Sequence, residues 1–155
     1  MKIIPTIILG FVCVTATVRA VPPGPPTRAD LAKHSDLIAI VTVTNVTEHI
    51  SPKDAWERGT RQSAVAVVDR IIKGTATRTL HLDYNGPPMS LLCRPPGLST
   101  GQFLVFLRRQ GDGFVRTDDW YSQATIATNH VKFQMEQVVD LKNAVAELER
   151  IVQKR

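Results

Sequence analysis

The segment Arg78–Tyr84 alternates apolar and polar residues with a period of two, which is the pattern of a strand that buries one face. This alternation, with short apolar runs bounded by turn residues, predicts strands at Leu37–Thr47, Ala64–Ile72, Arg78–Tyr84, Phe103–Arg108 and Phe114–Thr117. Weaker strand character returns at Ala124–Thr128 and Val131–Phe133. The sequence therefore predicts a mainly β protein.

Two segments follow a helical pattern instead. Thr27 with Asp30 three residues later resembles a capping box, which predicts a short helix over residues 28–34. Near the C-terminus, apolar residues spaced three and four apart predict an amphipathic helix over residues 136–153 that packs on the sheet. Its apolar stripe consists of Val138, Leu141, Val145, Leu148 and Val152.

The order of these elements predicts a small OB-like barrel of five to six strands with a C-terminal amphipathic helix. A hairpin turn at Gln110–Gly113 joins two of its strands. A β-sandwich is the alternative architecture. Two long connections, Glu48–Gln62 and Asn85–Gly101, are candidate functional loops, because long loops in a small domain are uncommon.

The N-terminus carries the pattern of a signal peptide. Lys2 precedes an apolar run from Ile3 to Val14, and Val18 with Ala20 fits a cleavage site. We therefore expect three parts: a signal peptide at 1–20, a Pro-rich leader at 21–29, and one domain at 30–155. This predicts a secreted or periplasmic protein that begins at Val21 and has no transmembrane segment after cleavage.

Cleavage would change both the charge and the cysteine count. Lys2 and Arg19 would be lost, which leaves 17 basic and 14 acidic residues and a net charge of +3. So mild an excess favours solubility over nucleic-acid binding. Cys13 would also be lost, so Cys93 would be the only cysteine and an intramolecular disulfide would be impossible.

Three core segments resemble a diffuse set of secreted, mostly bacterial proteins. These segments are SDLIAIVTV at Ser35–Val43, AVVDRIIKG at Ala66–Gly74, and GQFLVFL at Gly101–Leu107 followed by Gly111–Phe114. Such proteins are similar to the OB-fold of netrin modules and tissue inhibitors of metalloproteinases. The resemblance covers roughly Asp30 to Phe133, and it implies the fold more than any function.

The sequence departs from those inhibitors at their inhibitory end. They chelate the zinc of their target through an N-terminal cysteine, whereas the predicted N-terminus here is Val21, followed by prolines. Their ladder of disulfides is also missing. No inhibitory residue can therefore be carried over to this chain.

Motifs for catalysis, cofactors and metals are weak. The four histidines are scattered without zinc-ligand spacing, there is no G-x-S-x-G elbow, and no Gly-rich phosphate loop precedes a helix. We therefore expect no metal, no cofactor and no enzymatic activity. Export also makes nucleic acid an unexpected partner, although OB barrels often bind it.

The sequence is best interpreted as an exported, non-enzymatic binding module for a protein or polysaccharide partner. The predicted binding residues lie in the two long connections, and they are Trp56, Arg58, Cys93, Arg94 and Leu98. Two alternatives stay open. One is a thiol-dependent enzyme centred on Cys93, and the other is a structural envelope component that acts through the C-terminal helix.

Overall fold

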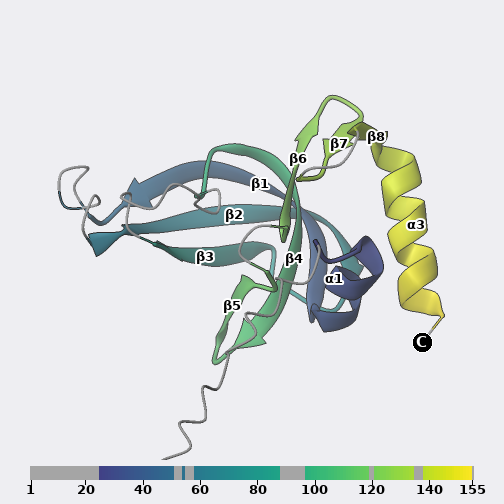
Figure 1. Cartoon of the computed structure of the whole chain (residues 1–155), viewed down its shortest axis with the longest axis horizontal. Coiled ribbons are helices and arrows are strands. Elements are labelled where there is room, and N and C mark those ends of the chain that lie inside the picture. Colours follow the sequence, from purple (N-terminus) through teal and green to yellow (C-terminus); the bar gives the residue numbers. More distant parts are fainter. Residues whose placement is uncertain are drawn as a thin grey trace, which may run out of the picture.

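Five strands close into a barrel, and in the described part of the chain three further strands of the same sheet and two helices lie on one side of it (Figure 1). The computed structural model describes residues 25–50, 54, 58–87, 97–118, 121–134 and 138–154. The barrel strands are β1 (Leu37–Glu48), β2 (Thr60–Lys73), β3 (Thr79–Gly86), β4 (Gly101–Gln110) and β5 (Gly113–Arg116). The remaining elements are α1 (Arg28–His34), β6 (Gln123–Ala127), β7 (His130–Lys132), β8 (Val138–Asp140) and α3 (Leu141–Gln153).

The strand order around the barrel is β1-β2-β3-β5-β4, and β4 pairs again with β1 to close it. Neighbouring strands are antiparallel except β3 and β5, which run parallel where Leu82 faces Phe114. This confirms the predicted OB-like barrel with a C-terminal helix. The sandwich alternative is wrong, because β1 closes the sheet on itself by pairing with both β2 and β4.

The apolar core has two layers that share the barrel wall. Inside the barrel, Val41, Leu82 and Val105 belong to one buried cluster. Outside it, Ile38 and Phe106 belong to a second cluster that α1, α3, β6 and β7 cover. Strand β4 therefore has buried side chains on both faces from Phe103 to Leu107, as its continuous apolar sequence predicts.

Helix α1 begins at the predicted capping box. The Thr27 hydroxyl accepts a hydrogen bond from the backbone N–H of Asp30 at 3.1 Å, and the Asp30 carboxylate accepts one from the backbone N–H of Thr27 at 3.1 Å. Hydrogen bonds from the Thr27 hydroxyl and backbone hold the pKa of Asp30 below its ordinary value of 3.8. This stabilisation is present at neutral pH, and it is lost as the pH falls through the lowered pKa.

The C-terminal helix is shorter than predicted. Its expected start at Glu136 is wrong, because residues 138–140 form strand β8 beside β7 and the helix begins at Leu141. Asp140 ends the strand and caps the helix, since its side chain accepts a hydrogen bond from the N–H of Asn143 at 3.1 Å. Val138 is 57% exposed and lies outside the apolar stripe, whereas Val145 and Leu148 are buried in the outer core.

The predicted signal peptide at 1–20 lies outside the described residues, as do Val21–Gly24 of the leader. Within the described part of the chain, no helix combines the length and the apolar character needed to cross a membrane.

Candidate binding face

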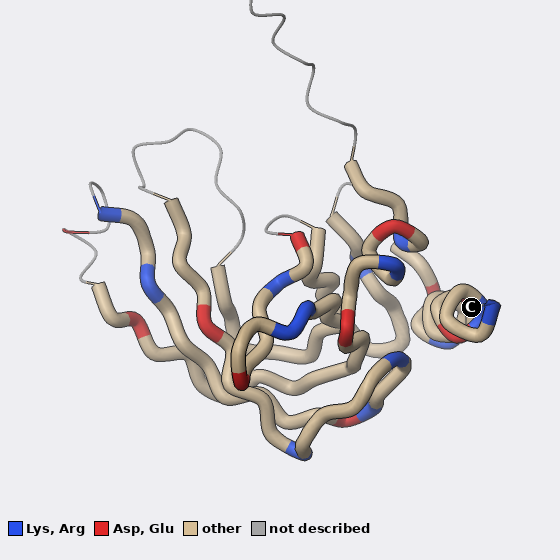
Figure 2. Tube along the Cα trace, turned by 90° about the horizontal axis from the view of Figure 1, so that it is seen from below, with Lys and Arg blue, Asp and Glu red and all other residues tan. Residues whose placement is uncertain are grey.

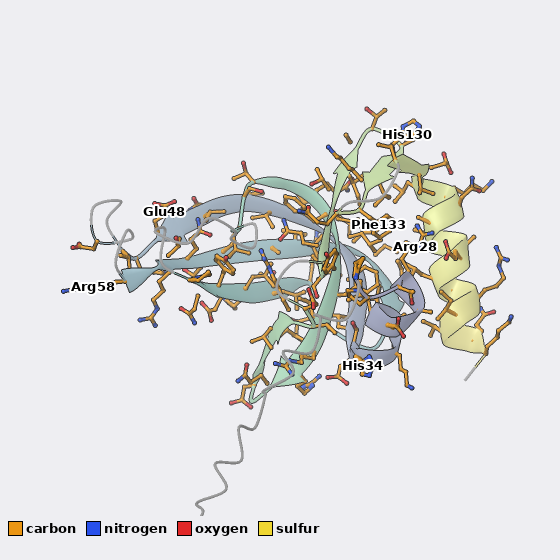
Figure 3. The ribbon with its side chains drawn as sticks, viewed as in Figure 1. Arg28, His34, Glu48, Arg58, His130 and Phe133 are labelled. Carbon is orange, nitrogen blue, oxygen red and sulfur yellow. The ribbon has the colours of Figure 1, made fainter. Side chains whose placement is uncertain are left out.

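The two long connections leave the barrel at the same end. The first follows β1 and leads into β2, and the second follows β3 and leads into β4. The pairing of Glu48 with Gln62 and of Thr60 with Gly86 places these strand ends side by side. Figure 3 shows Glu48 and Arg58 together at this end of the barrel, which is the end opposite α3.

Two of the five predicted binding residues can be placed. Trp56, Cys93 and Arg94 lie outside the described residues. Arg58 is exposed just before β2, where it presents a cation to solvent. Leu98 is only 9% exposed and packs in the core inside the barrel, so its side chain anchors the second connection and offers no contact surface.

Gln62 fixes the end of the second connection to the start of the first. Its side-chain oxygen accepts a hydrogen bond from the backbone N–H of Leu98 at 2.8 Å, and its amide nitrogen donates to Glu48 Oε1 at 3.3 Å. The guanidinium of Arg116 donates to the Gly97 carbonyl at 3.2 Å and lies 4.7 Å from the centre of the Tyr84 ring. No local pattern predicts this anchor, because Gln62 and Leu98 are 36 positions apart.

We expect Gln62→Leu to lower the free energy of unfolding by about 1–3 kcal/mol, because the buried N–H of Leu98 would lose its acceptor while side-chain volume stays similar. Denaturant midpoints measure the loss, and amide hydrogen exchange at Leu98 locates it. Gln102→Leu, at a more exposed glutamine of β4, is the control. If Leu98 kept its protection from exchange in Gln62→Leu, the proposed anchor would be wrong.

The outer surface of β1, β2 and β3 forms a second feature beside these connections. Cross-strand pairing aligns outward-facing side chains from the three strands in rows. The rows are Thr42–Val67–Thr79, Asn45–Val65–His81 and Thr47–Ser63–Asp83. We call these nine residues the β1–β3 outer face.

The centre of the β1–β3 outer face is apolar and exposed. Val65 is 43% exposed and Val67 is 36% exposed, whereas the alternate residues Ala64 and Ala66 point into the barrel and are buried. Hydroxyl, amide, imidazole and carboxylate groups surround the two valines. An apolar centre with a polar rim is the arrangement of a binding surface.

One pair at the edge of this face has the residue types of a catalytic dyad. His49 Nε2 lies 2.7 Å from the Ser63 hydroxyl oxygen. Nucleophilic catalysis also needs a third group that orients the imidazole, and within the described residues no carboxylate hydrogen-bonds His49. The described residues likewise contain no group of three or more His, Cys, Asp or Glu side chains that could hold a metal ion.

The fold and this surface define the class of the protein, which is an OB-like barrel with an exposed face on its first three strands. No protein-family model matches the sequence, and no curated protein matches it. The function must therefore be argued from the chemistry of the surface.

Proposed function

We propose that the chain is an exported, non-enzymatic binding module whose β1–β3 outer face docks a protein partner. The observation that carries the proposal is the exposure of Val65 and Val67 at the centre of a polar surface. Burying apolar side chains of this kind drives protein association, and the polar rim supplies hydrogen bonds that fix orientation. The signal-peptide pattern at residues 1–20 supports export.

The position of this face in the barrel also supports the proposal. OB-folds bind their ligands on the face of the second and third strands and on adjacent loops. In this chain that face is flanked by the connection that carries Arg58. Its nine side chains include aliphatic groups and no Phe, Tyr or Trp ring, which favours a protein over a sugar that would stack on such a ring.

The test replaces the apolar centre with charge. We expect the double variant Val65→Arg/Val67→Arg to remain folded and to bind its partner 10- to 100-fold more weakly, which is about 1.4–2.8 kcal/mol. A photo-crosslinker at position 65 would first capture the partner from the exported fraction, and calorimetry with the purified partner would then measure affinity. Circular dichroism would check that the variant keeps its fold.

Ile71→Arg is the matched control, because Ile71 is also on β2, is 41% exposed, and lies beyond the β1–β3 outer face. Its affinity should stay within threefold of the unmodified protein. Equal weakening by both variants would contradict the proposal. A function that survives in the Val65→Arg/Val67→Arg variant but is abolished by Cys93→Ser would instead favour the thiol-dependent enzyme.

A further inference from the structure

Helix α3 presents a row of cations to solvent. Lys142, Arg150 and Lys154 are all exposed and are separated by multiples of four residues, with the exposed Ala146 completing the row. Residues four apart lie on nearly the same side of a helix, so the three charges fall within an arc of about 120° along about 18 Å of the helix. We call these three residues the basic ridge.

The acidic residues of α3 do not neutralise the basic ridge. Glu147 forms an ion pair with Arg28 at 3.2 Å, and Glu149 forms one with Arg70 at 2.7 Å. Both pairs join α3 to neighbouring elements, α1 and β2 respectively. Both carboxylates are therefore paired with cations outside the basic ridge, and within the described part of the chain no ion pair joins them to Lys142, Arg150 or Lys154.

Helix stability does not account for the whole ridge. Arg150 and Lys154 lie near the C-terminus, where the helix dipole favours positive charge. Lys142 lies in the first turn, where the dipole disfavours a cation, and the acidic residue at this helix end is the N-cap Asp140, whose side chain accepts a hydrogen bond from the N–H of Asn143. The charge of Lys142 thus opposes the dipole of its own helix, but it extends the row of cations by two turns.

We propose that the basic ridge is a docking surface for a linear acidic polysaccharide. Complementary charge carries the assignment, because three exposed cations spread along one helix match a chain with repeated anionic groups. A lipid bilayer fits less well, because the ridge has no large apolar residue to enter it and three cations contribute only about 3 kcal/mol near an anionic membrane. The same strip lacks the aromatic rings on which single-stranded nucleic acid would stack.

A protein partner is also a poorer match for this surface. The exposed row carries three charged side chains and only Ala146 as an apolar group, so it has no apolar centre of the kind that protein interfaces bury. Figure 2 views α3 almost along its axis and shows it at the edge of the molecule. The basic ridge is separate from the β1–β3 outer face and does not depend on the function proposed for that face.

The experiment measures binding of the full chain to heparin, a sulfated linear polysaccharide, at several salt concentrations. We expect the triple variant Lys142→Gln/Arg150→Gln/Lys154→Gln to bind at least tenfold more weakly at low ionic strength and to elute from immobilised heparin at lower salt. The control, Arg78→Gln/Arg108→Gln/Lys132→Gln, removes the same charge from exposed positions outside α3, and its affinity should stay within threefold.

Three results would overturn the proposal. One is equal weakening in the two triple variants, which would mean that only the overall charge matters. Another is tighter binding to vesicles of anionic phospholipid, or to a single-stranded oligonucleotide, than to heparin through the same three residues. The third is no retention of the unmodified protein. Val65→Arg/Val67→Arg should not weaken heparin binding, so failure of this proposal and failure of the protein-binding face remain distinguishable.

Discussion

Replacing Phe106 with alanine should lower the free energy of unfolding by about 3–5 kcal/mol. The Phe106 side chain is fully buried and lies on the outer side of the barrel wall, where α1, α3 and β6 cover it. Its backbone pairs with Ile38 of β1 and donates a hydrogen bond to the Ser122 carbonyl at 2.8 Å. Because the backbone is held on both sides, the wall cannot move in to fill the space that the ring leaves.

Chemical denaturation followed by circular dichroism measures this loss. Val138→Ala is the control, because Val138 also belongs to the strand system but is 57% exposed, and its stability should change by no more than about 0.5 kcal/mol. Leu104→Ala should behave like Phe106→Ala, at about 2–5 kcal/mol, since Leu104 is buried in the same cluster. Similar midpoints for the Phe106 and Val138 variants would contradict the two-layer core.

Replacing Gly74 with alanine should lower the free energy of unfolding by a similar amount, about 2–6 kcal/mol. Gly74 follows β2 with a φ of +81°, which L-residues rarely adopt. A Cβ at this position would also lie 2.1 Å from the backbone carbonyl oxygen of Asp36. That carbonyl cannot withdraw freely, because the N–H of Asp36 is hydrogen-bonded to the Leu107 carbonyl at 2.8 Å.

The variant Gly111→Ala separates the backbone strain of a positive φ from the steric clash of an added Cβ. Gly111 also has a positive φ, +59°, but no atom lies within 4 Å of an added Cβ. It should therefore show only the backbone strain, about 1–2 kcal/mol. Thermal and denaturant unfolding measure the free energy of unfolding of the two variants. Equal losses would show that the Asp36 carbonyl moves away from the added Cβ at no cost in stability.

The fold could be predicted because its strands carry local signals. Leu80, Leu82 and Tyr84 alternate with polar residues, and all three are buried inside the barrel. Thr27 and Asp30 form the predicted cap of α1. These patterns depend on residues that are close in the sequence, so one sequence suffices to interpret them.

The exposed face could not be predicted in the same way. In Ala64–Val67, small and large apolar residues alternate, and the sequence does not say which set points inward. Ala64 and Ala66 point into the narrow barrel, whereas Val65 and Val67 are exposed to solvent. The start of α3 was missed for a similar reason, because Val138 continues the helical spacing but its hydrogen-bonding partners are in β7.

The position of Leu98 also depended on distant residues. The sequence suggested a loop contact, but the side chain fills the barrel interior because Gln62 holds its backbone and Arg116 holds that of Gly97. Pairings across such sequence separations leave no local pattern. Of the two predicted binding residues that the structure describes, Arg58 lies at an exposed position that agrees with the role expected for it, and that role stays a prediction.

The pairing of β1 with β4 has a consequence for the way the chain folds. β1 is the first strand to be synthesised and β4 the fourth, yet Ile38 must meet Phe106 before the barrel exists. Bringing β1 and β4 together costs loop-closure entropy before most core contacts have formed. Folding should therefore be slow for a domain of this size. If the chain is exported as proposed, a route that carries unfolded chains would benefit from this delay, because the barrel could not close until β4 had been synthesised.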